Sequence, residues 1–167
     1  LLKTGSLAID GVEVGSWYTP EQVRSFRRSL PDLPFTYHAG SLATSLQTKK
    51  MSLPQLGEYL SATGSPWLSL HIELLPVFIY MLGSRLGIHL PPPKTQSALQ
   101  QFLELFDSLR SAAGVPLLLE NLMSLRQPKY HYAADPALIS EIIERTGAGL
   151  LLDISHARIA AAYREQH

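Results

Sequence analysis

Cysteine is absent from the 167-residue sequence, and the two charge signs balance, with 14 Lys and Arg against 14 Asp and Glu. Without thiolates the chain has no disulfide, no thiolate zinc site and no iron–sulfur cluster, so His, Asp and Glu would have to bind any metal. A net charge of zero gives no general basic field for a phosphate backbone, which disfavours nucleic acid as a partner. The absence of cysteine also suits a reducing compartment, and we expect a cytoplasmic protein.

Long apolar runs and a starting methionine are also missing. No run approaches the roughly 20 apolar residues that a membrane-spanning helix needs, and no basic segment precedes an apolar one as in a secretion signal. We therefore expect no membrane association. Because the sequence begins with Leu1, we expect it to be a piece of a longer protein. Its 46% of apolar residues are enough for one hydrophobic core.

Short apolar segments alternate with segments of helical spacing. The segments 19–22 (TPEQ) and 52–55 (SLPQ) each combine an N-cap residue, an early proline and a capping-box glutamine, which predicts that two helices begin there. Further helices are expected between Asp135 and Gly147 and at 95–113. In the second of these, the apolar residues at helical spacing, which we expect to be buried, are Ala98, Phe102, Leu105, Leu109 and Ala112. Residues 75–93 are expected to form a short helix and a loop. The strands expected between these helices are 8–14, 35–38, 66–74, 115–120 and a fifth that ends at Asp153.

This alternation predicts an α/β fold with parallel strands and right-handed crossovers. A doubly wound sheet and a TIM-type barrel both fit the order of elements. Polar groups end several different strands, which favours the barrel, because a barrel brings all strand ends to one mouth whereas an open sheet spreads them across its width. About five βα units are visible where a barrel has eight. We therefore expect one incomplete TIM-type (β/α) barrel domain over residues 1–167.

The stretch from Gly149 to Ala162 contains the most informative polar residues. Its apolar residues, 150–152 and Ile154, suit a strand buried on both faces. Asp153 and His156 stand at the C-terminal end of this strand. Ligand binding and catalysis in α/β folds occur at that end. We therefore expect Asp153 and His156 to belong to a functional site.

Other candidate residues end other strands. His38 ends the second strand, while His71 and Glu73 stand two residues apart in the third and are expected to face one cavity. Glu120 and Asn121 end the fourth. A carboxylate at the end of a buried strand is costly unless it is paired or bound to a metal, which favours a ligand role for Glu120. Imidazole and carboxylate suit Fe, Mn and Zn, and one carboxylate can bridge two ions.

Simpler structural interpretations remain open for these residues. A histidine at a strand end is often only a hydrogen-bonding residue. Glu120 and Asn121 could be a pair that caps a helix or holds a loop in place by hydrogen bonds. Glu13 and Glu73 are explained equally well by plain salt bridges. Arg126, Lys129 and Tyr130 are most simply part of a solvated loop, with a substrate contact as the alternative. No motif surrounds His89, His131 or His167, which we expect to be solvated.

Four segments, YHAGS, SLHIE, LLLENL and LLLDISHARIAA, in this order and one βα unit apart, resemble the xylose-isomerase-like TIM-barrel superfamily, which includes endonuclease IV and the sugar isomerases. Within it, ENL followed by TGAGLLLDISHARIAA is most similar to the multinuclear non-haem iron-dependent oxidases that modify ribosomally made peptides. The resemblance implies that Glu120 is a bridging carboxylate and that Glu120 and Asp153 are catalytic. The metal ligands that it implies are His38, His71, Glu120, Asp153 and His156.

The resemblance also implies two or three iron ions, O₂ as co-substrate, a peptide substrate and a separate substrate-recognition protein. In that family an Asn often stands at the place of His156, and its later ligands have no counterpart before His167, so we expect an incomplete site. Residues implied to support the ligands or contact the substrate are Glu13, Glu73, Asn121 and Arg126. Two other classes stay open. One is a zinc- or manganese-dependent enzyme of the same fold, either a sugar isomerase or epimerase or a DNA-repair phosphodiesterase; the other is an inactive fragment or interaction module.

Overall fold

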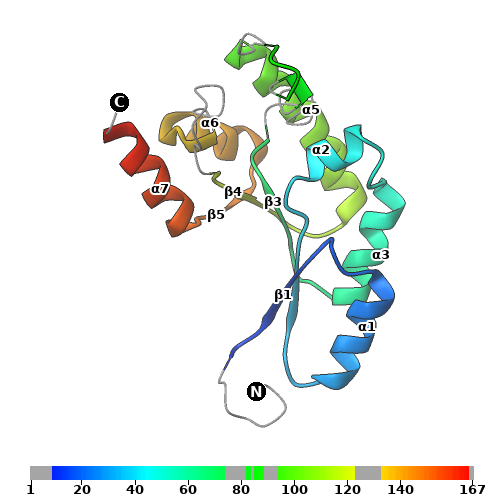
Figure 1. The fold of residues 1–167 in the computed structure, drawn as a ribbon. Helices are drawn as coiled ribbons and strands as arrows, with labels where there is room; N and C mark the ends of the chain where they lie inside the picture. The colour runs from blue at the N-terminus through cyan, green and yellow to red at the C-terminus, as the bar shows by residue number, and fades with distance from the viewer. Residues whose placement is uncertain (1–8, 74–81, 84, 89–93, 123–132, 166–167) are drawn as a thin grey trace.

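The structure, a computed structural model, describes residues 9–73, 82–83, 85–88, 94–122 and 133–165. Its five parallel strands pair in the order in which they occur in the chain (Figure 1). They are β1 (Val12–Gly15), β2 (Phe35–His38), β3 (Leu68–His71), β4 (Leu117–Glu120) and β5 (Gly149–Leu151). A doubly wound sheet reverses its strand order at a switch point, whereas a barrel keeps neighbours in chain order. The predicted partial TIM-type barrel is therefore confirmed.

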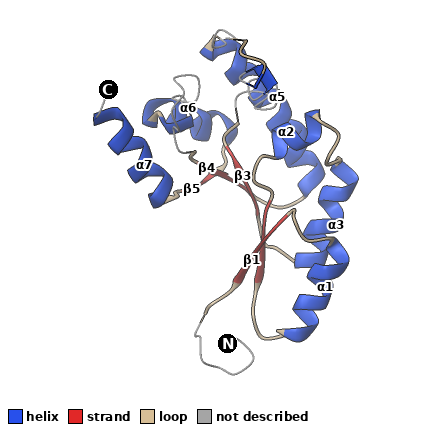
Figure 2. Cartoon of the chain, viewed as in Figure 1, coloured by secondary structure: helices blue, strands red, loops and turns tan. Residues whose placement is uncertain are grey.

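The helices lie between the strands, and successive ones pack side by side in the pairs α1–α3, α3–α5 and α5–α6. Figure 2 shows α1, α3 and α5 along one side of the sheet. Their bounds are α1 (Pro20–Ser29), α2 (Leu42–Gln47), α3 (Leu53–Thr63), α5 (Thr95–Ala113), α6 (Pro136–Thr146) and α7 (Ile154–Glu165). No helix of the described residues is long and apolar enough to cross a membrane.

Local side-chain bonds explain where the predicted helices begin. At α1 the Thr19 hydroxyl accepts the Gln22 N–H at 3.2 Å, and the Gln22 side chain accepts the Thr19 N–H at 2.8 Å. The residues Ser52 and Gln55 repeat this exchange before α3. The Asp135 carboxylate accepts the Ala137 N–H at 3.1 Å and begins α6. Each cap accepts hydrogen bonds from backbone amides that the first turn of a helix leaves without a partner. The first residues of these helices could therefore be predicted from the sequence.

The strand register gives the sheet two chemically different faces. The face toward the helices carries buried apolar residues, which are Val14, Phe35, Tyr37, Leu68, Leu70, Leu117 and Leu119. Side chains of α2, α3 and α5 such as Leu42, Leu56 and Phe106 complete this core. Each fully buried side chain of this size contributes about 1.5–3 kcal/mol. The other face carries polar groups at the carboxyl ends of the strands, so the core and the candidate site lie on opposite faces.

Three details differ from the sequence-based expectations. The run 150–152 with Ile154 was expected to be buried, but Leu150, Leu152 and Ile154 are 46%, 58% and 66% exposed. That prediction was wrong because β5 pairs only with β4 within the described sheet and no second strand covers its outer edge. In α5 the buried line includes Leu99 and Phe106, while Ala112, expected in it, is exposed.

Strand and loop boundaries also differ. β1, β3 and β4 are shorter than expected, and α2, which follows β2, was not predicted at all. Residues 1–8 and most of the segment 75–93, for which a short helix and loop were expected, lie outside the described residues; within that segment, 82–83 and 85 are helical.

Candidate metal centre

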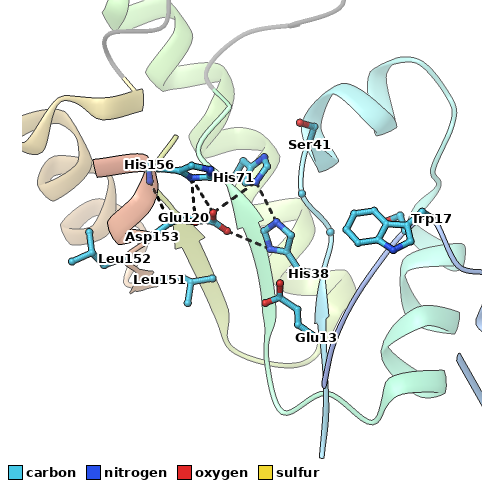
Figure 3. Close-up of a pocket in the computed structure, with 13 residues that line it drawn as sticks. Glu13, Trp17, His38, Ser41, His71, Glu120, Leu151, Leu152, Asp153 and His156 are labelled. Carbon is cyan, nitrogen blue, oxygen red and sulfur yellow. Dashed lines mark hydrogen bonds and ion pairs between the residues drawn. The ribbon is translucent and has the colours of Figure 1, made fainter. Parts of the chain in front are cut away.

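The carboxyl ends of the strands open into one cavity of about 690 Å³ (Figure 3). β2, β3 and β4 each contribute their last residue to its lining, and the segment after β5 contributes Leu152, Asp153 and His156. The structure thus brings together all five residues that sequence reasoning selected as ligands: His38, His71, Glu120, Asp153 and His156. Parallel pairing explains the convergence, because His71 lies directly opposite Glu120 in the register and His38 opposite Ser69.

Two groups of ligand-type residues share Glu120. In the first, Nε2 of His38 lies 3.2 Å from Nε2 of His71, and the Glu120 carboxylate lies 3.5 Å from Nδ1 of His38 and 3.9 Å from Nε2 of His71. In the second, Nδ1 of His156 lies 3.2 Å from Glu120 Oε1 and 3.6 Å from Asp153 Oδ2. Each group has the residue types and the close spacing that a metal ion requires.

The start of α7 places Asp153 and His156. The Asp153 carboxylate accepts the backbone N–H of His156 at 2.8 Å, as an N-cap residue does, and the first helical turn then carries the His156 ring back toward Glu120. Asn121 holds the same segment from β4. Its amide donates to the Asp153 carbonyl at 3.0 Å, and its side-chain oxygen accepts the Asp153 N–H at 2.8 Å. Asn121 therefore supports the segment that carries two candidate ligands.

Hydrogen bonds fix which nitrogen of two histidine rings carries the proton. The Asn121 carbonyl lies 2.9 Å from Nδ1 of His156 and can only accept, so this nitrogen is protonated. The Ser69 hydroxyl donates to the Tyr37 carbonyl, so it accepts a proton from Nδ1 of His38 at 3.0 Å. Nε2 is then the nitrogen through which each ring could bind a metal. Metal-binding histidines characteristically donate their other ring N–H in this way.

The contact between His38 and His71 tests whether these residues fit a metal. Two imidazole nitrogens 3.2 Å apart need a proton or a cation between them. Two ligands about 2.1 Å from one ion lie about 3.0 Å apart in octahedral and about 3.4 Å apart in tetrahedral coordination, which brackets the observed separation. Nδ1 of His71 is buried with no hydrogen-bond partner among the described residues, so Nε2 is the nitrogen of this ring that faces the other candidate ligands. The donor set therefore fits a metal ion.

Burial and neighbouring charges set the protonation states at neutral pH. Burial, together with the charges of His38 and His156, lowers the pKa of His71 from 6.5 to about 4. Its ring is therefore neutral and free to bind a metal. Burial raises the pKa of Glu120, although His38 and His156 oppose that shift. The hydrogen bond from the His156 backbone lowers the pKa of Asp153, which keeps this carboxylate ionised.

The remaining predicted residues lie in different places. Glu13 lines the cavity from β1. Glu73 does not: it is buried and accepts bonds from the N–H and hydroxyl of Thr44 at 3.1 and 3.3 Å. The expectation that His71 and Glu73 face one cavity was wrong because β3 ends at His71 and the strand alternation stops there. Arg126 lies outside the described residues.

Ser69 and Trp17 are among the residues of the cavity region that were not predicted from the sequence. Ser69 fixes the ring state of His38, and its place two residues before His71 on the same strand was the available signal. Trp17 lines the cavity, although it lies in the loop after β1, where no pattern indicated a site.

Comparison with known proteins gives consistent matches. The model of the family described as "RiPP precursor modification enzyme MbnB/TglH/ChrH" matches residues 13–165. A UPF0276 protein of Rhizobium meliloti is 39% identical over 72 residues, which are 43% of this chain and 23% of that protein. A UPF0276 protein of Streptomyces avermitilis is 31% identical over 107 residues, or 62% of this chain and 22% of that protein. The matched segments thus cover less than a quarter of the length of each of these relatives.

Proposed function

Because this chain belongs to the family of RiPP precursor modification enzymes MbnB/TglH/ChrH, we propose that it provides five βα units of an enzyme that oxidises a ribosomally made peptide with O₂ at a multinuclear non-haem iron centre. The observation that carries this proposal is the position of Glu120, which belongs to both groups of ligand-type residues. A carboxylate can bridge two ions because it offers two oxygens. A separate peptide-recognition protein and a cytoplasmic location complete the proposal, in which residues 1–167 form one partial barrel domain.

The proposed roles follow from the contacts of each side chain. His38 and His71 would bind through Nε2, Glu120 would bridge, and Asp153 and His156 would complete the second group. Iron, when bound, would supply the electrons and the open positions for the reaction with O₂. Ser69 and Asn121 orient the His38 and His156 rings, so little reorganisation accompanies metal binding. The neutral His71 ring has no proton to release at pH 7.

Replacing Glu120 by Gln should remove most of the bound iron. The amide offers one weaker oxygen donor and removes a negative charge that both groups share, so iron affinity should fall at least about 10-fold. Metal-free protein would be loaded anaerobically with Fe(II) and desalted, and its iron content measured by inductively coupled plasma mass spectrometry. Far-UV circular dichroism should change little, because the core lies on the other face of the sheet.

Glu104→Gln is the matched control, because Glu104 is an exposed carboxylate on α5 that bonds only to Gln100 among the described residues. Equal iron content in the two variants would contradict the bridging role. Tight binding of zinc or manganese without iron would instead favour the isomerase or phosphodiesterase alternatives. In the full-length enzyme with its peptide, turnover should stop under strict anaerobiosis, and undiminished turnover there would end the oxidase proposal.

A further inference from the structure

We propose that Trp17 is a binding subsite for an apolar or aromatic side chain of the peptide substrate, next to the residue that reacts. This inference rests on the proposed function. Trp17 lines the same cavity as the candidate ligands, and its side chain is 76% exposed, the highest value among the large apolar side chains of the described residues. Figure 3 shows the indole beside His38, on the far side of that ring from Glu120.

The indole packs against the loop after β1. A Cβ atom added to Gly15 would lie 2.5 Å from the Trp17 ring, so the ring lies directly on the Gly15 backbone and would have to move to admit a larger residue there. The Tyr18 ring meets Trp17 at 6.4 Å between centroids and meets Phe26 of α1 edge-on at 5.1 Å. These contacts restrict the indole, and a restricted side chain loses less conformational freedom when a ligand covers it.

The cavity has apolar side chains on two sides and polar ligand atoms between them. Leu151 and Leu152 line it on the β5 side, opposite Trp17, and His38 and Glu120 lie between these sides in Figure 3. A peptide crossing the cavity would therefore contact the leucines on one side and the indole on the other, with one residue over the candidate metal centre. Tryptophan is enriched among the residues that dominate binding energies, because it buries a large and rigid surface when a ligand covers it.

Selection of random peptides tests this subsite without knowledge of the natural substrate. Random 12-residue peptides displayed on phage would be selected on the iron-loaded 167-residue chain and, separately, on the metal-free chain. We expect the enriched peptides to share an aromatic or large aliphatic residue at one position. The best peptide would then be synthesised with a fluorophore, and its Kd measured by fluorescence anisotropy.

Trp17→Ala should raise the Kd of this peptide at least 10-fold, and Trp17→Phe should raise it less. Trp67→Ala is the matched control and should leave the Kd unchanged, because Trp67 is 37% exposed and lies before β3, at the opposite end of the sheet from the cavity. A peptide with alanine at the shared position should bind the wild type more weakly than the original peptide does. The same change in the peptide should cause little further loss of affinity for the Trp17→Ala variant. This coupling would not arise if Trp17 only covered Gly15.

The outcomes separate the two proposals. Any one of three results would overturn the Trp17 subsite. They are equal peptide affinity of the wild type and Trp17→Ala, no coupling between Trp17 and the shared peptide position, and no enriched peptide on either form of the chain. Iron content is measured independently on each variant, and we expect it to be the same for wild type, Trp17→Ala and Trp67→Ala. A wild-type chain that binds no iron but still binds the peptide through Trp17 would end the iron proposal and keep the subsite.

Discussion

The imidazole of His71 lies between two other histidine rings, with ring centroids 4.9 Å from His38 and 6.3 Å from His156. Without a metal, a proton on this ring would be poorly solvated and would face two rings that can also become charged. The folded protein therefore keeps His71 neutral far below the pH at which an ordinary histidine is protonated. The arrangement favours metal binding at neutral pH, and it should make the metal-free protein sensitive to acid.

The pH dependence of unfolding should reveal this residue. The pKa of His71 is about 4 in the folded protein, against 6.5 for an ordinary solvated histidine, so the unfolded chain takes up the proton first as the pH falls. Stability is therefore lost between pH 6.5 and pH 4, and the loss from His71 reaches about 2 kcal/mol by pH 5. Urea unfolding of the metal-free protein at a series of pH values would measure it.

His71→Gln provides the comparison, because the raised pKa values of Glu73 and Glu120 act in the opposite direction and are present in both proteins. The free energy of unfolding should depend less steeply on pH in the variant between pH 7 and pH 5. Parallel curves for the two proteins would show that His71 is protonated in the folded state as readily as in the unfolded chain.

At the scale of elements, the short helix α2 depends on a residue of another strand. The side chain of its N-cap residue, Ser41, makes no capping hydrogen bond to the start of the helix. Instead Glu73, which follows β3, accepts the N–H and the hydroxyl of Thr44. The loop before α2 includes Gly40, whose φ of +55° favours glycine and whose carbonyl accepts the His71 N–H at 3.0 Å. Glu73 thus ties α2 and this loop to the candidate metal centre.

Replacing Glu73 by Ala should loosen α2 and leave the other helices intact. The change removes an N-terminal cap and leaves the half-buried donors of Thr44 without their acceptor, which costs about 0.5–2 kcal/mol. Hydrogen exchange measured by mass spectrometry should become faster in residues 41–48. Glu58→Ala, which removes an exposed carboxylate of α3, should leave hydrogen exchange in residues 41–48 unchanged. Unchanged exchange in the Glu73 variant would disprove the capping role.

The elements that were predictable from sequence are those whose cause is local. The caps of α1, α3 and α6 each lie within four residues of the bonds that they make. The strand ends at His38 and Glu120 were also predicted, whereas β3 was expected to continue to residue 74 but ends at His71. By contrast, α2 is capped by a residue 29 positions away. The exposure of Leu150 depends on whether another strand pairs with β5, which the pattern of apolar residues does not reveal.

At the scale of the whole molecule, the described sheet has two outer edges, β1 and β5, which lie at its two ends in Figure 1. The β5 edge is the more apolar. Leu150, Leu152 and Ile154 are exposed there, and a groove of about 470 Å³ between α6 and α7 is lined by Ile139 and Ala160 together with the two leucines. An unpaired strand beside an exposed apolar surface favours association with another chain.

The 167-residue chain should therefore self-associate, and Leu150→Lys should reduce this association. In sedimentation velocity, the mean sedimentation coefficient of the wild type should rise over a roughly 100-fold range of protein concentration. The Leu150→Lys variant should show a smaller rise, because the charge of a lysine on an edge strand opposes pairing with another strand. Leu86→Lys is the matched control, since Leu86 is 64% exposed outside this edge. Its association should equal that of the wild type. A wild-type sedimentation coefficient that stays constant, or an equal loss of association in both variants, would show that the β5 edge does not drive association.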